Sequence, residues 1–298
     1  MNRTNFIGIS LTLLGAIFWG VSGTCAQYLQ INQHINTPWL LTTRLFTAGL
    51  ITVLYELIRN PKQCLAVFHC KQDVFKLLIF GILGIALCQY SYFVTIIYAG
   101  AGIATVIQYV APIIIILYMF IVHHKKPTIA EIVSVFLAST GTIIIALHGE
   151  FSLAKLNSQV LFWGLTSAAA VAIYSVQPVS LIKKYGTLPI VGWGMIAGSI
   201  ISLAIWEPLS TEAIIDKNTL FSFFGVIIIG TVFAFNFYLE GVRRIGAIQG
   251  SILASTEPLS AAFISWLFLN NIYTTSDIIG FCLILSTIFI LAFNKKKK

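Results

Sequence analysis

The sequence predicts an all-α integral membrane protein with ten transmembrane helices, arranged as two inverted five-helix repeats with both termini in the cytoplasm. Composition, the lengths of the apolar runs and the placement of Lys and Arg support this fold class. Of the 298 residues, 58% are hydrophobic and 9% are charged, and the mean hydropathy is +0.91. A soluble domain of this length does not have such a composition. The apolar runs take up almost the whole chain, which leaves no room for a soluble catalytic or nucleotide-binding domain.

Ten apolar runs predict the helices. Each run has about 18–25 residues, enough to cross roughly 30 Å of hydrocarbon at 1.5 Å of rise per residue. The first run is interpreted as a retained helix because it is too long for the apolar core of a signal peptide. The predicted spans are 6–28, 38–58, 75–98, 101–121, 129–147, 159–181, 188–206, 219–239, 246–269 and 275–293.

The basic residues orient these spans. If the N-terminus lies inside, the outer loops contain only Lys155 and Lys217, and Arg44 is the one cation placed deep within a span. The inner segments contain Arg3, Arg59, Lys62, Lys71, Lys76, Lys125, Lys126, Lys183, Lys184, Arg243, Arg244 and Lys295 to Lys298. This asymmetry is what the positive-inside rule describes, and it predicts a multi-pass plasma-membrane protein. The net charge of +8 is spread over short loops that face anionic lipid, so we expect contact with the bilayer and no nucleic-acid partner.

The two halves of the sequence resemble each other at an offset of 146 residues. The matched pairs are Gly100 with Gly246, Ala104 with Gly250, Gln108 with Ala254, Pro112 with Pro258 and Tyr92 with Tyr238. Residues 1–148 therefore form a first repeat, 149–158 an outer connecting loop, and 159–298 a second repeat that ends in a basic tail. Because five helices is an odd number, the second repeat must enter the membrane from the opposite side. Inverted repeats of this kind are typical of secondary transporters, whose substrate site lies near the membrane midplane.

The paired prolines predict bends at equivalent places in the two repeats. Pro112 and Pro258 each leave the carbonyl four residues earlier without its helical donor, so each should bend its span. We expect a gating or structural role for both, next to a cavity.

Four short motifs occur in order along the chain: Phe18-Trp19-Gly20, Thr43-Arg44-Leu45, Phe162-Trp163-Gly164 and Thr256-Glu257-Pro258-Leu259. With these motifs the whole chain resembles the EamA family of the drug/metabolite transporter superfamily, a group of ten-helix permeases and exporters. The resemblance implies that spans one, three, four, six, eight and nine line a central cavity, while spans five and ten pack at the periphery. Substrates in this family range over amino acids, amines, nucleosides, vitamins and drugs, so the resemblance does not fix the solute.

Aromatic and amide residues on these six spans are the candidates for substrate binding. Aromatic faces offer apolar area and cation–π attraction, and phenols and amides can orient a small polar solute. The alternative is that several of them belong to interfacial belts or pack helices together. The candidates are Trp19, Tyr90, Tyr92, Gln108, Tyr109, Trp163, Tyr174, Asn236 and Tyr238.

Glu257 is the candidate for proton coupling. It stands about eleven residues into span nine, roughly 16 Å from the cytoplasmic end of that helix. Near the midplane a lone carboxylate is costly and tends to take up a proton or a partner. The equivalent residue of the first repeat is Ala111, so repeat symmetry does not require an acid here. The structural alternative is a protonated Glu257 that ties the bend at Pro258 to a neighbouring helix.

Arg44 lies about six residues inside the outer end of span two. It could contact an anionic group of the substrate, pair with a carboxylate, or extend to the outer headgroups. Because span two is not among the innermost helices of the related fold, the sequence favours a structural or gating role.

These observations predict a secondary transporter that moves a small metabolite, such as an amino acid or amine, by alternating access, as a proton-coupled exporter. One alternative is an uncoupled facilitator or uptake permease of the same fold. The other is a membrane-embedded enzyme acting on lipid, which would need two convergent acids or a nucleophile–base pair. We expect no enzyme activity and no cofactor. We also expect no metal, since Cys64, His69 and Cys70 match no zinc pattern. The charge pattern is compatible with a homodimer.

Overall fold

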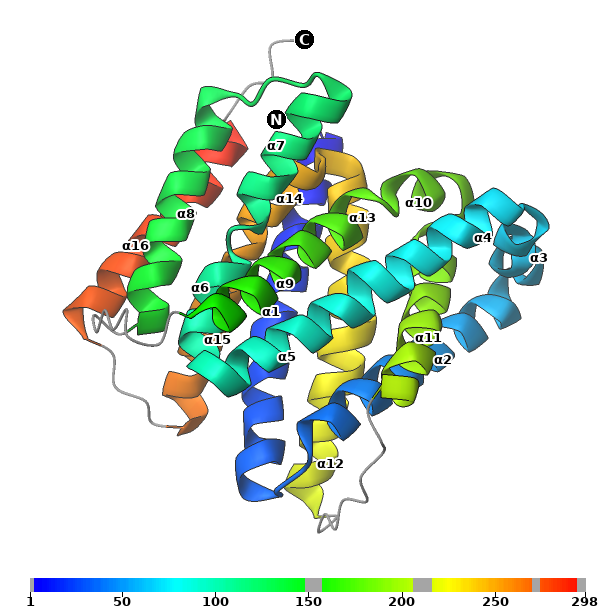
Figure 1. The fold of residues 1–298 in the computed structure, drawn as a ribbon, viewed down its shortest axis with the longest axis horizontal. Helices are drawn as coiled ribbons and strands as arrows, with labels where there is room; N and C mark the ends of the chain where they lie inside the picture. Colours follow the sequence, from blue (N-terminus) through cyan, green and yellow to red (C-terminus); the bar gives the residue numbers. More distant parts are fainter. Residues whose placement is uncertain (1–2, 148–156, 206–215, 270–273, 294–298) are drawn as a thin grey trace.

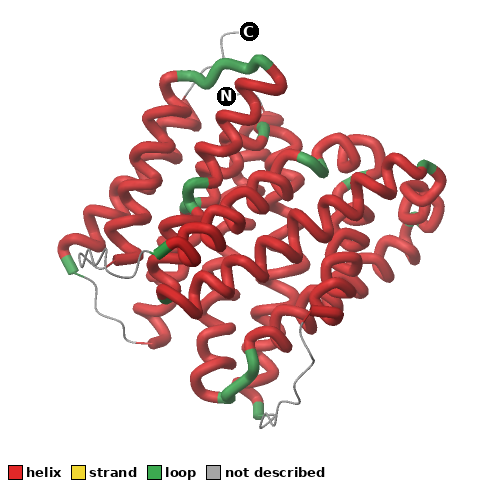
Figure 2. The backbone as a smooth tube through the Cα atoms, viewed as in Figure 1, coloured by secondary structure: helices red, strands yellow, loops and turns green. Residues whose placement is uncertain are grey.

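A computed structural model describes residues 3–147, 157–205, 216–269 and 274–293. Throughout these ranges the chain forms helices joined by short turns, without a strand (Figure 2). Lys155, most of the predicted outer connecting loop and the predicted basic tail at Lys295 to Lys298 lie outside the described residues. Helix α1 begins and helix α16 ends at the same end of the bundle, at the top of Figure 1, as an even number of crossings requires.

Helices of unequal length follow one another along both halves of the described chain. In the first half they are α1 (Arg3–Asn32), α2 (Thr37–Arg59), α3 (Pro61–Leu65), η1 (Ala66–His69), α4 (Lys71–Leu78), η2 (Ile79–Ala86), α5 (Leu87–Ala99), α6 (Ala101–Gln108), α7 (Ala111–His123) and α8 (Ile129–Leu147). In the second half they are α9 (Ser158–Val176), α10 (Val179–Tyr185), α11 (Thr187–Ile205), α12 (Lys217–Phe224), η4 (Gly225–Phe233), α13 (Ala234–Ile245), α14 (Ala247–Ala254), α15 (Thr256–Leu269) and α16 (Thr275–Phe293).

Eight helical stretches in the described part of the chain are long and apolar enough to cross a membrane. They are Thr4–Asn32, Pro38–Arg59, Lys71–Ala99, Gly102–His123, Ile129–Ala146, Ser158–Tyr185, Lys217–Ile245 and Thr275–Phe293. The predicted span at 188–206 corresponds to the shorter apolar helix Thr187–Leu203. The predicted span at 246–269 is divided between α14 and α15. The protein is therefore an all-helical integral membrane protein, and the count of ten crossings stays a prediction.

Backbone features recur at the same 146-residue offset as the sequence matches. The π-helices η2 and η4 begin at Ile79 and Gly225, which are equivalent positions in the two halves. Gly100 and Gly246 join consecutive helices with φ of +88° and +93°, a conformation that favours glycine because a Cβ would be strained there. Short π-helical insertions are rare and are often found at functional sites.

The helices do not pack as two self-contained halves. In Figure 1, α2 lies beside α11 and α8 beside α16, and these pairs each join one half of the chain to the other. Helix α1 packs against η4, α13 and α15 of the second half, and α9 packs against η2, α5 and α6 of the first. The first helix of each half, α1 or α9, thus packs mainly against helices of the other half.

Glycine lets the π-helices approach α1 and α9. A Cβ on Gly84 of η2 would lie 2.9 Å from Cβ of Tyr174 in α9. A Cβ on Gly230 of η4, the equivalent position, would lie 1.9 Å from Cβ of Ser22 in α1. At both positions a Cβ would clash, so only glycine allows the helices to come this close. Close approach matters because helices in lipid associate through packing and not through a hydrophobic force.

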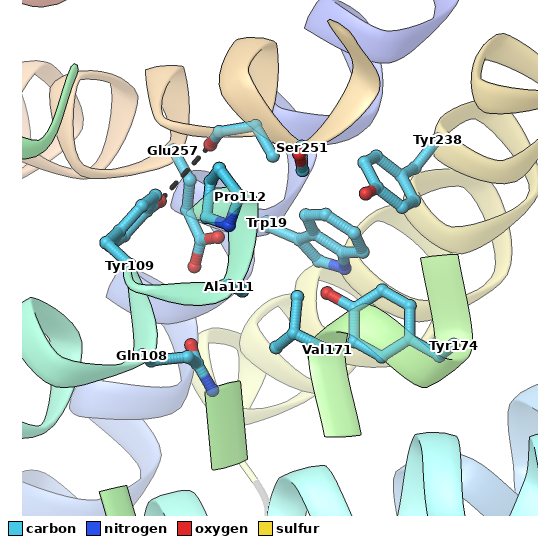
Figure 3. Close-up of a pocket in the computed structure, with 11 residues that line it drawn as sticks. Trp19, Gln108, Tyr109, Ala111, Pro112, Val171, Tyr174, Tyr238, Ser251 and Glu257 are labelled. Atoms are coloured by element: carbon cyan, nitrogen blue, oxygen red, sulfur yellow. Dashed lines mark hydrogen bonds between the residues drawn. The ribbon is translucent and has the colours of Figure 1, made fainter. Parts of the chain in front are cut away.

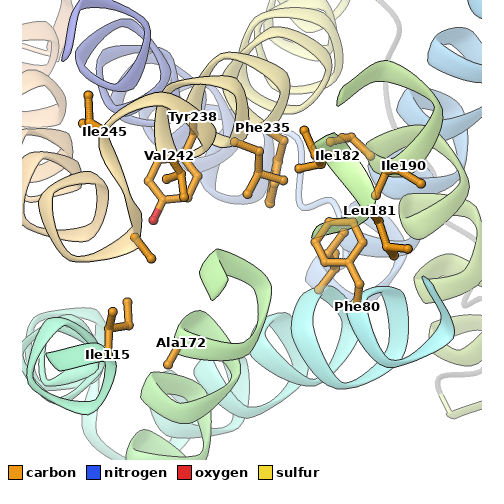
Figure 4. Packing of buried hydrophobic residues seen from close by; sticks show 14 of the residues in the cluster. Phe80, Ile115, Ala172, Leu181, Ile182, Ile190, Phe235, Tyr238, Val242 and Ile245 are labelled. Atoms are coloured by element: carbon orange, nitrogen blue, oxygen red, sulfur yellow. The ribbon is translucent and has the colours of Figure 1, made fainter. Parts of the chain in front are cut away.

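Buried apolar side chains fill the space between the helices (Figure 4). Phe80 of η2 and Leu181 of α10 both belong to this cluster, and both are almost completely inaccessible. Two hydrogen bonds connect helices that are distant in the sequence. Trp193 Nε1 donates to the Cys64 carbonyl at 3.0 Å, and Tyr185 Oη donates to Asp73 Oδ2 at 2.7 Å. These contacts fix the ends of α3, α4, α10 and α11 against one another.

Candidate functional site

A pocket lies where the middle portions of α1, α9 and α13 meet the breaks between α6 and α7 and between α14 and α15 (Figure 3). The cavity is small: about 40 Å³ is available to the centres of water-sized molecules, which is room for a few ordered waters. The lining residues are Trp19, Gln108, Tyr109, Ala111, Pro112, Val171, Tyr174, Tyr238, Ser251, Ala254 and Glu257.

The two breaks are joined by a hydrogen bond. Helix α14 ends at Ala254, and Pro258 lies in the first turn of α15, where its ring nitrogen cannot donate to the Ala254 carbonyl. The Tyr109 hydroxyl, from the break between α6 and α7, donates to that carbonyl at 3.2 Å (Figure 3). The bend predicted at Pro258 is thus a full interruption of the helix, and a side chain from the other half satisfies the freed carbonyl.

Pro112 also stands in the first turn of a new helix, α7, and its side chain is buried against the pocket. The turn at Tyr109 and Val110 separates α6 from α7, so this predicted bend is a second interruption. The two interruptions occupy equivalent positions in the repeats. Broken helices at membrane depth are tolerated where they line a cavity, because the freed backbone groups then meet other protein groups or water.

Glu257 places a carboxyl group in the pocket. It lies in the first turn of α15, where the positive end of the helix dipole favours negative charge. Figure 3 shows its side chain between the rings of Tyr109 and Trp19. Within the described part of the chain, its carboxylate oxygens form neither a hydrogen bond nor an ion pair.

The glycine of the first Phe-Trp-Gly motif allows α1 to reach Glu257. A Cβ on Gly20 would lie 2.0 Å from Ser260 Oγ, 2.6 Å from the Ala261 nitrogen and 2.8 Å from the Glu257 carbonyl oxygen. Trp19, the preceding residue, consequently lies against the pocket. The glycine of the second motif, Gly164, lies equally close to Ile107 of α6, where a Cβ would meet Cγ2 at 2.6 Å.

Aromatic rings form one wall of the pocket. The Trp19 ring lies 4.9 Å from that of Tyr238 and 5.1 Å from that of Phe235. Tyr174 lies 6.0 Å from Tyr238, whose hydroxyl pairs with Ser175 Oγ at 2.8 Å. Trp19 and Tyr174 therefore face the pocket from a rigid aromatic support, with the Tyr238 phenol already engaged.

Gln108 begins a polar cluster at the other end of the pocket. Its Nε2 donates to Ser167 Oγ at 2.7 Å and to Cys88 Sγ at 3.6 Å. Ser167 is fully buried and Cys88 nearly so. The Gln108 side-chain oxygen remains able to accept a hydrogen bond from a solute.

The structure places five of the nine aromatic and amide candidates on the pocket wall: Trp19, Gln108, Tyr109, Tyr174 and Tyr238. The other four lie outside its lining. Tyr90 packs edge-on against Trp163 at 5.4 Å, and Tyr92 Oη pairs with Thr105 Oγ1 at 2.8 Å. Asn236 donates to the Val232 carbonyl of its own helix at 2.7 Å. Span three, which the family resemblance places among the lining helices, contributes no residue to this pocket.

The pocket also contains residues that the sequence did not single out: Ala111, Val171, Ser251 and Ala254. Helical spacing carries the signal for one of them: Val171 precedes Tyr174 by three residues on α9, so the two share a face. Ser251 and Ala254 are separated from Glu257 by the break after α14, so helical spacing does not relate them to it. Arg44 and Pro258 are not part of the lining. Across the described ranges, no three His, Cys, Asp or Glu side chains group as a metal site.

Two threonine–carboxylate pairs in which the acid is buried were also missed. Glu131 Oε2 accepts from the Thr128 backbone nitrogen at 2.9 Å, and Asp277 Oδ2 accepts from that of Thr274 at 2.8 Å. The two pairs are 146 residues apart, and they stand at the start of α8 and of α16. The sequence pattern that marks them is a threonine three residues before an acid, directly ahead of an apolar run. They are helix caps, and they lie outside the pocket.

Apolar helices of membrane-spanning length, with an internal pocket at paired helix breaks, define a multi-pass membrane protein built around an internal site. The model of the EamA-like transporter family matches residues 6–147 and 158–293. The chain belongs to this family and is a membrane transporter.

Relatives and a solved structure agree with this assignment. YicL of Salmonella typhimurium, described as an uncharacterized inner membrane transporter, is 34% identical and covers 98% of this chain and 97% of its own. An uncharacterized transporter of Archaeoglobus fulgidus is 24% identical over 93% and 95%, and PecM of Dickeya dadantii is 24% identical over 76% and 77%. One crystal structure superimposes with a TM-score of 0.79 and 16% identity over 99% of both chains, which shows the shared fold.

Proposed function

We propose that this protein is a secondary transporter of the plasma membrane that exports a small metabolite by alternating access, coupled to proton entry. The observation that carries the proposal is the Glu257 carboxyl group, which lines the central pocket without a fixed partner among the described residues. A carboxyl group near the midplane favours its protonated form when dry and its ionised form when hydrated. Alternate exposure to the two sides would let it take up a proton on one side and release it on the other.

The helix breaks support the movement that this mechanism needs. Two interrupted helices meet at the pocket through one hydrogen bond, between Tyr109 and Ala254. A single bond of this kind contributes about 0.5–1.5 kcal/mol, so it can be exchanged during a conformational change. The proton and the solute would compete for Glu257 or bind in sequence, and either order couples their movements.

Purified protein in liposomes that contain a pH-sensitive dye tests the proposal. Metabolites that raise the melting temperature of the detergent-solubilised protein are added to these vesicles. We expect solute-dependent proton movement in the wild type and its loss in Glu257→Gln, which keeps the shape of the side chain. Glu56→Gln is the matched control, because Glu56 is a buried acid on α2 outside the pocket.

The other outcomes separate the alternatives. Solute flux that is equal in the wild type and in Glu257→Gln, at all pH gradients, would replace the proposal with an uncoupled facilitator. Chemical change of the added compound would indicate an enzyme.

A further inference from the structure

Helix α10 is a short extra helix in the second half of the chain. In the first half, residues 33–36 connect α1 to α2, whereas in the second half residues 177–186 connect α9 to α11 and contain α10. Both ends of α10 have the character of a hinge. Pro178 cannot donate to the Tyr174 carbonyl, and Gly186 has a φ of +91°, a conformation that favours glycine. The helix can therefore turn as a unit between these two points.

An acid on α4 holds the far end of α10. Asp73 Oδ2 accepts from Lys184 Nζ at 2.6 Å and from Tyr185 Oη at 2.7 Å, and these three residues form a latch. Gln63 Nε2 of α3 also donates to the Tyr185 carbonyl, at 3.0 Å. The side chain of Asp73 is 9% exposed and that of Lys184 is 58% exposed. The latch therefore lies at the edge of the protein, where water can replace its contacts.

The opposite face of α10 lies in the apolar core. Leu181 and Ile182 are almost fully buried, and they belong to the same cluster as Tyr238, against which Tyr174 packs (Figure 4). Tyr174 and Tyr238 line the pocket. The side chains of α10 thus extend the core from the pocket wall toward the end of the molecule that carries the predicted inner segments. A movement of α10 would open this part of the core.

Apolar side chains close the equivalent place at the predicted outer end. Helices α4 and α12 begin at Lys71 and Lys217, which are equivalent at the 146-residue offset. Where α4 meets α10 through Asp73, α12 meets the start of α2 through Phe223 and Trp39, whose rings lie 6.1 Å apart. The buried residues of this cluster are Leu29, Ile35, Leu40 and Val226. An apolar contact resists opening because its surface must enter water, whereas an exposed charged contact exchanges its partner for water at little cost.

We propose that α10 is the inner gate of the transporter and that Asp73 latches it shut. This inference rests on the proposed function and on the predicted orientation of the chain. When the latch is closed, the apolar face of α10 separates the pocket from the inner solution. When the latch opens, α10 turns about its two hinges, and Asp73 keeps Lys76 of its own helix, 3.9 Å away, as a partner.

The accessibility of a cysteine in the pocket tests the gate without a known solute. The reporter is Ser251→Cys in a cysteine-free background, because Ser251 lines the pocket. A membrane-impermeant methanethiosulfonate reagent is added to inside-out and to right-side-out membrane vesicles, and the labelling rate is measured from each side. Asp73→Asn should make labelling from the inner side at least about fivefold faster, because the closed state alone loses contacts with a charged group. Labelling from the outer side should not rise.

Two further variants assign this effect to the latch. Lys183→Gln is the matched control, since Lys183 is the exposed cation next to Lys184 on the same helix, and it should leave the labelling rate unchanged. Lys184→Gln should speed inner labelling by itself and add little to Asp73→Asn, because the two residues share one contact. Unchanged inner labelling in Asp73→Asn overturns the inference. An equal acceleration in Lys183→Gln also overturns it.

A cross-link tests the closed gate even if Asp73→Asn does not fold. A short thiol-reactive cross-linker that joins Asp73→Cys to Lys184→Cys should stop labelling of the reporter from the inner side and leave labelling from the outer side. Inner labelling of the cross-linked protein at the rate of the reporter alone would show that α10 is not the gate.

The side from which the reporter is labelled separates this inference from the function on which it depends. Labelling from both sides at rates that do not respond to the latch would refute the gate and leave alternating access intact. Labelling from one side only, in the reporter and in every variant, would refute alternating access and with it the proposed function.

Discussion

The Tyr109 hydroxyl lies 3.2 Å from the Ala254 carbonyl oxygen and connects the two broken helices at the centre of the molecule. The carbonyl is available because Pro258, four residues later, has no N–H to donate. The bond spans the two halves of the chain, and Glu257 lies three residues from the acceptor. The stability of the two breaks and the position of Glu257 are therefore linked at this point.

Tyr109→Phe should cost stability and reduce transport. The substitution leaves a part-buried carbonyl without its donor, with a penalty of about 1 kcal/mol. Thermal unfolding in detergent measures this penalty, and solute-dependent proton flux measures the change in transport. Tyr55→Phe is the control, since Tyr55 is 51% exposed on the outside of α2 and its loss should change stability by less than about 0.5 kcal/mol. A Tyr109→Phe protein as stable as the wild type would mean that another group, or water, satisfies the carbonyl.

Gly20→Ala should separate α1 from α15. The added Cβ would lie 2.6 Å from the Ala261 nitrogen, which is backbone and cannot move aside cheaply. Overpacking of this kind costs about 1–3 kcal/mol and should displace Trp19 from Glu257. Gly23→Ala is the matched control on the same helix, because a Cβ there meets nothing within 4 Å. That control should be neutral or more stable by up to about 1 kcal/mol, since alanine favours helix. Similar melting temperatures for the two variants would contradict the close approach.

Gly100→Ala and Gly246→Ala should destabilise the protein to a similar degree. Both positions have open space for a Cβ, so the cost comes from the positive φ alone, about 1–2 kcal/mol. Chemical or thermal unfolding of both variants beside Gly23→Ala separates this strain from the general effect of alanine. If only one of the two variants lost stability, the equivalence of the repeat junctions would not extend to energetics.

The orientation of the chain can be measured at Lys183 and Lys217, which lie at opposite ends of the second half. Both are exposed, and the positive-inside distribution places Lys183 inside and Lys217 outside. In a cysteine-free background, an impermeant maleimide should label Lys217→Cys in intact cells and Lys183→Cys only after permeabilisation. Labelling of both from the same side would refute the predicted topology.

Much of the fold could be predicted from the sequence because its strongest signals are physical and local. Apolar length located the spans, and the 146-residue offset located the two helix breaks and placed Glu257 beside one of them. Two of the ten predicted spans are not borne out by helix length, because 246–269 is divided between α14 and α15 and the span at 188–206 corresponds to the shorter helix Thr187–Leu203.

Side-chain direction was the part that the sequence did not reveal. Tyr90 and Tyr92 follow the π-helix η2, and Asn236 and Tyr238 follow η4. A π-helical stretch has more than 3.6 residues per turn, so it rotates every later side chain about the helix axis. No apolar periodicity marks that rotation, and three of these four residues consequently lie away from the pocket wall. The partners of α1 were equally hidden, since spacing along the chain does not show that a helix packs with the other half.

The exchange of α1 and α9 between the halves has a consequence for biogenesis. When the ribosome has completed the first five-helix segment, α1 still lacks the surfaces of α13 and α15 that cover it in the finished molecule. Its small-residue face, with Gly8, Gly15 and Gly20, must remain in lipid until the last third of the polypeptide has been inserted. The nascent protein therefore reaches its compact state only near the end of translation, and quality-control proteases would meet a half-made molecule with an unsatisfied helix.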